Sequence, residues 1–141
     1  MALRRFALIF GIVFLIVGAG GFIPAMVAPH SHPDVTVTSG LGLELSLFPI
    51  NVLHNIVHLL FGIWGLLAAR SVAGARVYAK AVAIIYALLT VMGFIPALRL
   101  HTTFGLVPLY GNDIWLHALL AIVAGYFGFV YRRDEQAVRR A

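Results

Sequence analysis

The sequence Asn51-Val-Leu-His54-Asn-Ile-Val-His58 opens the second of four long apolar runs in the chain. Residues four apart in an α-helix lie on one face, one turn apart, so the two histidines are predicted to be neighbours. Asn51 follows Pro49 and is a natural N-cap, which predicts a helix over about residues 52–69. The stretch therefore predicts an apolar helix whose first turns carry paired imidazoles.

The composition assigns this helix to a membrane. The chain has 141 residues, of which 62% are hydrophobic and 11% are charged. A soluble domain carries roughly 25% charged residues, so the membrane class is favoured. The absence of cysteine excludes disulfides, thiolate metal ligands and cysteine nucleophiles. The net charge of +5 does not indicate a nucleic-acid partner, because the basic residues are spread over the ends of the apolar runs.

The apolar runs predict an all-α membrane protein. We expect transmembrane helices over about residues 6–27, 52–69, 77–98 and 114–131, since about 20 apolar residues cross a hydrocarbon core of about 30 Å. Arg4-Arg5 before the first run also fits the start of a signal peptide, but such a peptide has an apolar core of only about 7–15 residues. The predicted fold is one domain, residues 1–141, with four transmembrane helices in two tandem hairpins.

The basic residues predict the orientation of these helices. One side of the membrane receives nine of them, namely Arg4, Arg5, Arg70, Arg76, Lys80, Arg132, Arg133, Arg139 and Arg140. The other side receives Arg99 alone. The positive-inside rule therefore predicts that both termini are cytoplasmic and that the two longer loops lie outside, in a plasma (inner) membrane.

The first outer loop is predicted to be ordered. Asp34-Val-Thr-Val-Thr38 alternates with period two, and so does Leu41-Gly-Leu-Glu-Leu-Ser-Leu47. Ser39-Gly40 between them suits a two-residue turn. The pattern predicts a short β-hairpin, or an extended loop, over the helix ends.

The loops also hold three histidines, which we expect to be solvated. His30 and His32 flank a serine in the first loop and could feed metal to deeper ligands, while His101 lies beside Arg99 in the second loop. Glu44 stands among leucines and glycines and could pair with Arg99.

A short motif recurs in the chain. Gly21-Phe-Ile-Pro-Ala25 near the end of the first predicted helix returns as Gly93-Phe-Ile-Pro-Ala97 near the end of the third. Both copies cross in the same direction, so the repeat halves, about residues 1–70 and 71–133, are parallel. Their natural symmetry is a pseudo-two-fold axis along the membrane normal.

The fourth apolar run opens much like the second, with Asn112-Asp113-Ile-Trp-Leu-His117. Aligning the two runs at His58 and His117 brings three imidazoles and one carboxylate to similar depth below the outer surface. Such a set suits a divalent ion such as zinc, copper or iron. The predicted metal ligands are His54, His58, Asp113 and His117.

Haem is an alternative cofactor, held by the symmetry-related pair His58 and His117. Small residues below this pair could open room for a porphyrin, although they also let helices approach closely without a ligand. These residues are Gly62, Gly65, Ala121, Ala124 and Gly128.

Other functions remain open on the sequence. The polar residues could be structural, as helix caps or interhelical hydrogen bonds, in an accessory subunit that packs against a larger membrane complex or a second copy. They could also belong to a proton or solute pathway, although transporters more usually carry polar groups at mid-bilayer. An enzyme is least favoured, because no nucleophile, phosphate loop or paired carboxylates are evident.

The motifs LHNIVHLLFGIWGL and, in the fourth run, DxxLH resemble a bacterial family of small four-helix membrane proteins known only as a domain of unknown function. The resemblance spans nearly the whole chain, from Arg5 to Arg132. It implies four helices and a bacterial plasma membrane, and it implies no activity, substrate or cofactor. Its most specific residues are His54, Asn55, His58, Asp113 and His117.

Overall fold

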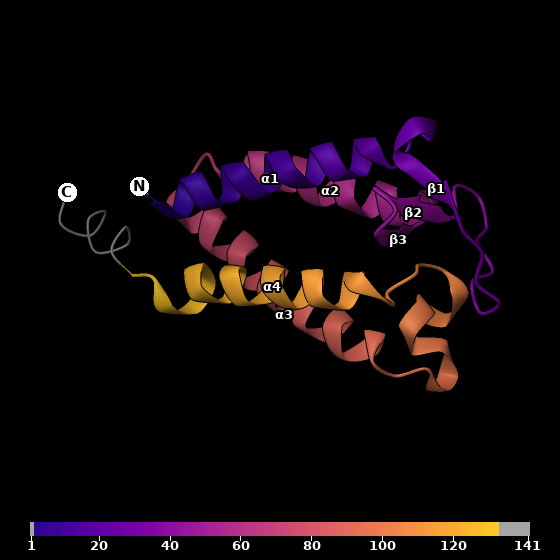
Figure 1. Cartoon of the computed structure of the whole chain (residues 1–141). Helices are drawn as coiled ribbons and strands as arrows, with labels where there is room; N and C mark the ends of the chain where they lie inside the picture. Colours follow the sequence, from indigo (N-terminus) through magenta and orange to yellow (C-terminus); the bar gives the residue numbers. More distant parts are fainter. Residues whose placement is uncertain (1, 133–141) are drawn as a thin grey trace.

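The computed structural model describes residues 2–132 and is mostly helical (Figure 1). Its long helices are α1 (Ala2–Gly20), α2 (Val52–Ala68), α3 (Val72–Gly93) and α4 (Asn112–Gly125), the last continuing into the π-helical turn η3 (Tyr126–Val130). The connections hold two 3-10 helices, η1 (Pro24–Met26) and η2 (Ala97–Gly105), and three strands, β1 (Val27–Pro29), β2 (Gly42–Glu44) and β3 (Phe48–Ile50). Of the basic residues used to predict the orientation, Arg133, Arg139 and Arg140 lie outside the described residues.

Three stretches are long and apolar enough to cross a membrane. They are Ala2–Gly20, Val72–Gly93 and Asn112–Val130. The fourth apolar helix, α2, is shorter, with 17 residues. The structure is thus consistent with a membrane protein.

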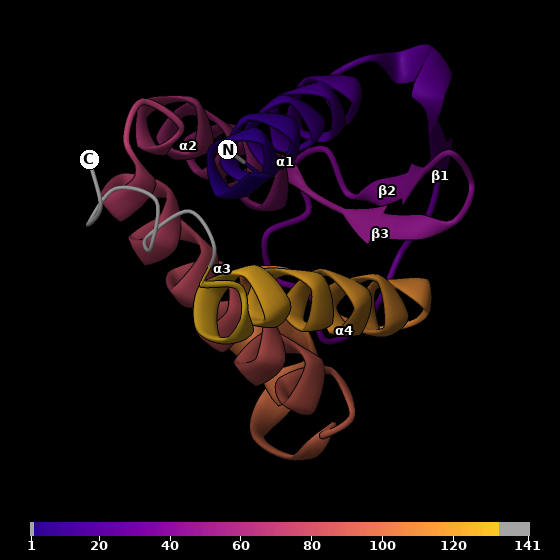
Figure 2. The same ribbon diagram turned by 90° about the vertical axis from the view of Figure 1, so that its left-hand side faces the viewer.

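The helices form two antiparallel hairpins. α1 packs mainly on α2, and α3 packs mainly on α4. In Figure 1 the chain enters α1 and leaves α4 at one end of the bundle, while the strands and η2 lie at the other end. Figure 2, seen from the first end, shows the α1–α2 pair beside the α3–α4 pair. The two longer loops therefore lie at one end of the bundle.

Glycines allow α1 and α2 to approach backbone to backbone. A Cβ atom built at Gly65 would lie 2.7 Å from the Cα of Gly11, and one at Gly62 would lie 2.6 Å from Leu15 Cγ. At Gly18 the nearest atoms are the carbonyl oxygen of Asn55 and the amide nitrogen of Leu59, both at 2.9 Å. Small residues at such positions stabilise helix pairs in membranes by permitting close van der Waals contact.

The interior is aromatic and small, and the surface is aliphatic. Phe6, Phe14, Tyr78 and Tyr86 are buried together with alanines of α1 and α3. Large aliphatic side chains instead face outward; they include Ile9, Ile12, Ile16, Leu60, Ile84, Leu88, Leu119 and Ile122. A soluble protein would place such residues inside. This arrangement is compatible with contact to a lipid bilayer.

Two helices have boundaries that differ from the prediction. α2 begins after Asn51, whose side-chain oxygen accepts the amide hydrogen of His54 at 3.0 Å, so the predicted N-cap is confirmed. The first helix was predicted to reach residue 27, but α1 ends at Gly20, because the chain turns at Gly20-Gly21 before Pro24 starts η1. The third was predicted over residues 77–98, but α3 is shifted towards the N-terminus, since Ser71 caps it and the chain turns again after Gly93.

The predicted hairpin pairing of residues 34–38 with 41–47 is wrong. β2 pairs instead with β1 on one side and β3 on the other, in an antiparallel sheet of order β1-β2-β3. Leu45 and Ser46 form the β2–β3 turn with positive φ angles of 53° and 61°, which sequence rules reserve for glycine and asparagine. Residues 34–38 contact η2, because Thr36 donates to the carbonyl of Gly105 with both its amide (2.8 Å) and its hydroxyl (2.8 Å).

The N-cap residue of α2 also holds the outer loops together. The Asn51 side-chain amide donates to the carbonyl of Val37 at 3.0 Å and to that of Leu106 at 2.7 Å. One buried side chain thus joins the start of α2 to both outer loops. The predicted ordered loop over the bundle is present, built from two loops rather than one.

Candidate metal centre

Three histidines converge at the loop end of the bundle. His54 and His58 lie in the first turns of α2, and His117 lies in the second turn of α4. All three are buried, with exposed fractions of 3%, 5% and 1%. One ring nitrogen from each lies within 4.8 Å of the others. We call these three residues the inner cluster.

The orientation of His54 leaves one nitrogen free to bind a ligand. Its Nδ1 lies 3.2 Å from the carbonyl oxygen of Pro49, in the middle of β3. A carbonyl can only accept, so Nδ1 carries the proton and Nε2 keeps the lone pair. This is the tautomer that a metal ligand needs, held by a backbone partner.

The other two histidines have ring nitrogens that the protein does not satisfy. The Nδ1 atoms of His58 and His117 are buried, and within residues 2–132 neither has a hydrogen-bond partner. Buried polar atoms are nearly always paired in proteins. The inner cluster therefore contains two imidazole nitrogens that no described protein atom satisfies.

Asp113 lies behind His117 rather than among the converging nitrogens. Its Oδ2 is 3.4 Å from Nε2 of His117, and both side chains are 2% exposed. The set of mutually close ligand atoms comprises the histidines and leaves Asp113 out. Oδ2 of Asp113 takes part in no hydrogen bond with the described residues, so its contact with His117 is electrostatic. A carboxylate beside a ligating histidine orients the ring and raises its basicity.

Aromatic rings fix the inner cluster from two sides. Phe14 of α1 lies 5.6 Å from the ring centre of His58, and Tyr86 of α3 lies edge-on to His117 at 4.8 Å. All four long helices thus contribute to the walls. Two cavities, of about 200 and 140 Å³, adjoin the cluster, and both are lined by His58 and His117 among mostly apolar side chains.

Asn55, which the sequence groups with the histidines, lies outside this convergence. Its side chain is 1% exposed, and in the described part of the chain neither amide atom has a hydrogen-bond partner. It packs against Gly21, where a Cβ would lie 2.3 Å from the Asn55 oxygen. The first glycine of the repeated motif therefore makes room for this side chain.

A second cluster, not predicted from the sequence, lies in the outer loops. His32, Asp34 and His101 each place a ligand atom within 4.8 Å of the others. The expectation that His101 is solvated is wrong, since it is 8% exposed. We call these three residues the outer cluster. The alternation of residues 34–38 predicts a strand rather than a ligand, and no spacing rule relates this loop to His101, which lies in η2.

The predicted pairing of Arg99 with Glu44 is replaced by another. Nε of Arg99 lies 3.7 Å from Oδ1 of Asp34. Glu44 is buried in β2, and burial raises the pKa of its carboxyl above the ordinary value.

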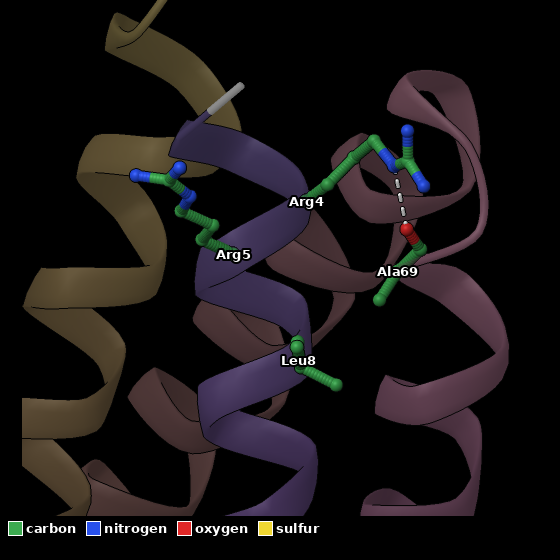
Figure 3. A pocket seen from close by; sticks show the side chains of 4 residues that line it. All are labelled: Arg4, Arg5, Leu8 and Ala69. Atoms are coloured by element: carbon green, nitrogen blue, oxygen red, sulfur yellow. Dashed lines mark hydrogen bonds between the residues drawn. The ribbon is translucent and has the colours of Figure 1, made fainter.

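The opposite end of the bundle has a recess with different chemistry (Figure 3). Arg4, Arg5 and Leu8 of α1 line it together with Ala69, and its volume is about 300 Å³. Nε of Arg4 donates to the carbonyl of Ala69 at 2.7 Å. The arginine thus satisfies a carbonyl at the C-terminal end of α2, as basic residues often do. No histidine lines this recess.

The comparisons with known proteins place the chain in a family. Neither the curated proteins nor the solved structures contain a significant match. The family described as "Domain of unknown function (DUF4383)" matches residues 4–130, which is most of the chain. The resemblance inferred from the sequence to a family of unknown function is therefore confirmed, and the chain belongs to the family described as Domain of unknown function (DUF4383).

Proposed function

We propose that this chain is a small integral protein of a bacterial plasma membrane that binds a divalent transition-metal ion through His54, His58 and His117. The observation that carries the proposal is the inner cluster itself. Three buried imidazoles from two helices bring ligand atoms within 4.8 Å of one another. Imidazole suits zinc, copper and iron, and tetrahedral zinc commonly takes three protein ligands.

Asp113 supplies the charge that such an ion needs. Three imidazoles are neutral as ligands, so a divalent ion would bring two positive charges into an apolar interior. A carboxylate 3.4 Å from Nε2 of His117 offsets part of this charge without occupying a coordination position. We therefore assign Asp113, named from the sequence as a ligand, to a supporting position.

The dimensions of the site favour an ion over haem. The cavities beside His58 and His117, about 200 and 140 Å³, are smaller than the roughly 300–1,000 Å³ of sites for drug-sized ligands. Gly62 and Gly65, which could have left space for a porphyrin, face the α1 backbone and Leu15 instead. The small residues thus serve helix packing.

The same packing weakens the accessory-subunit alternative. An accessory subunit would dock on a larger membrane complex through faces made of small residues. Gly11, Gly18, Gly62 and Gly65 are instead used within the chain, between α1 and α2. The partner that the surface supports is the lipid bilayer, because large aliphatic side chains cover its helices.

The proposed topology has four crossings with both termini cytoplasmic. α2, at 17 residues, is about 26 Å long at about 1.5 Å per residue, near the lower limit for a span. It runs back along α1 for its whole length in Figure 1, so it accompanies a span of membrane length. The positive-inside rule then places the loop end, with the inner cluster beneath it, on the outer side.

Three nitrogen ligands would leave a coordination position open. In zinc sites of this kind the open position takes water or an exogenous ligand. Here it would face the apolar cavities lined by His58 and His117. The arrangement suits reversible binding of an ion better than a closed structural site, and we propose no catalytic step.

Elemental analysis of protein purified without a polyhistidine tag tests this function. The wild type should carry about one more metal ion per chain than the His58→Ala/His117→Ala double variant, since the variant loses two of three ligands. His30→Ala, a loop histidine outside both clusters, is the matched control and should keep the wild-type content. Equal metal content in the wild type and a folded double variant would contradict the assignment.

A further inference from the structure

We propose that His32, Asp34 and His101 form a second binding site for a divalent transition-metal ion, in the outer loops. This inference does not rest on the inner cluster. It starts from a different set of atoms, two imidazoles and one carboxylate, that lie within 4.8 Å of one another.

The contact between Asp34 and His101 is the centre of this site. Oδ2 of Asp34 lies 3.4 Å from Nε2 of His101, whose side chain is 10% exposed. Nδ1 of His101 is buried and, among the residues described, has no hydrogen-bond partner. This imidazole thus has one nitrogen facing a carboxylate and one that no described atom satisfies, and a bound ion between His101 and Asp34 would use both facing groups as ligands.

Backbone contacts position the donors in advance. The Thr102 hydroxyl lies within 3.3 Å of the Asp34 carbonyl and 3.0 Å of the Arg99 carbonyl. Thr36 joins the same loop to Gly105. The two loops are therefore connected on both sides of the cluster, so the donors converge without any ion.

An aromatic ring holds His32 in place within the cluster. Its ring stacks on Tyr110, with centres 4.3 Å apart, and the Tyr110 hydroxyl is 3.0 Å from Nε2 of His30. The stacking fixes the plane of the His32 imidazole, and one of its ring nitrogens lies within 4.8 Å of the ligand atoms of Asp34 and His101.

The donor set selects the class of ion. Two imidazoles with one carboxylate suit zinc, copper or nickel, whereas calcium and magnesium prefer all-oxygen sites. Arg99, 3.7 Å from Asp34 Oδ1, competes with any cation for this carboxylate. Because Arg99 is 53% exposed, an arriving ion could displace it towards water. Removing this guanidinium should therefore strengthen binding.

Calorimetric titration of Zn²⁺ into full-length, untagged, metal-stripped protein in detergent micelles tests the site. Asp34→Asn and, separately, His32→Gln should each weaken one class of Zn²⁺ sites by at least about tenfold. Arg99→Gln should tighten the same class by up to about fivefold, since exposed ion pairs are weak. Ser31→Ala, at an exposed position in the same loop, should leave it unchanged.

The outcomes separate this site from the inner cluster. The His58→Ala/His117→Ala variant should keep the Zn²⁺ sites that depend on Asp34, whether or not the inner cluster binds metal. If Zn²⁺ binding is the same in the wild type, in Asp34→Asn and in His32→Gln, the outer site does not exist. If Arg99→Gln weakens binding, the ion does not use Asp34, and the proposal is equally overturned. Circular dichroism checks that each variant is folded. If Asp34→Asn fails to fold, His32→Gln, which alters only a half-buried side chain, still tests the site.

Discussion

The inner and outer clusters use similar residue types in opposite ways. The inner cluster stands on helices α2 and α4, its histidines are at most 5% exposed, and the nearby carboxylate of Asp113 contacts one of them. The outer cluster stands on loops, and its carboxylate, 38% exposed, lies among the donors with an arginine beside it. The position of the carboxylate is the main difference between them.

This difference follows from the surroundings of each cluster. In an apolar interior an unpaired carboxylate is costly, so the single buried aspartate contacts an imidazole. Near water a carboxylate needs no such protection and can remain a direct donor. We therefore expect the inner cluster to depend on helix packing and the outer cluster on loop contacts and local charge.

The largest expected effect comes from separating α1 from α2 beside the inner cluster. Gly18→Ala would place a Cβ 2.9 Å from backbone atoms of Asn55 and Leu59, in the helical segment that carries His58. Backbone atoms cannot rotate away, so α2 must shift. We expect a loss of about 1–3 kcal/mol in the free energy of unfolding. Zn²⁺ binding at the inner cluster should weaken while the outer cluster is unaffected.

Gly125→Ala is the control for this change. Its Cβ would meet only the Cβ of Ala83 at 3.9 Å, which is ordinary contact, and alanine favours the helix by up to about 1 kcal/mol. In detergent, the free energy of unfolding of Gly18→Ala should therefore be lower than that of the wild type, and that of Gly125→Ala should be higher. If both behave alike, the close α1–α2 approach does not position the inner cluster.

The next effect concerns the carboxylate of the inner cluster. Asp113→Asn keeps the shape of the side chain and removes its charge. Supporting carboxylates of this kind change metal affinity by about 10–100-fold, and we expect a loss in that range at the inner cluster alone. Zn²⁺ titration of the variant measures this loss. Asp34→Asn should show the converse result, with weaker binding at the outer cluster and unchanged binding at the inner cluster. An unchanged inner affinity would mean that Asp113 only serves the start of α4.

The inner cluster could be predicted from the sequence because residues four apart in a helix lie on the same face. His54 and His58 are four residues apart, and His58 was aligned with His117 because the fourth apolar run opens much like the second. One observation in the structure favours the internal repeat, although the repeat remains a prediction. Gly21 packs on Asn55 and Gly93 packs on Ile114, and these two partners correspond in the alignment that pairs His58 with His117.

The outer cluster could not be foreseen, because its backbone follows no periodic rule. Around His101, four residues without glycine's freedom adopt positive φ angles, namely Leu98, Arg99, Thr103 and Phe104. Sequence rules do not predict such conformations. The prediction for the first loop was wrong for a related reason. Its alternating pattern fits a hairpin, but in the structure residues 34–38 contact η2 instead of pairing with residues 41–47. Hydropathy, likewise, predicted the first helix but not its end at Gly20.

The smallest expected effect tests whether the His32 imidazole of the outer cluster is neutral when no metal is bound. The pKa of His32 is lowered in the folded protein, chiefly by burial, from its model-peptide value of 6.5. The unfolded chain then binds more protons between the two pKa values, so stability is fully present above about pH 6.5 and is lost as the pH falls through the folded pKa. His32→Gln should remove this loss. In chelator, the difference in stability between wild type and variant should shift in favour of the variant below pH 6.5, by less than about 1 kcal/mol for a half-buried group. Ser31→Ala, an exposed position in the same loop, should follow the wild type across the same range. A wild type that gains stability relative to His32→Gln on acidification would mean that His32 is held as a cation by Asp34, and a cationic His32 could not serve as a metal ligand.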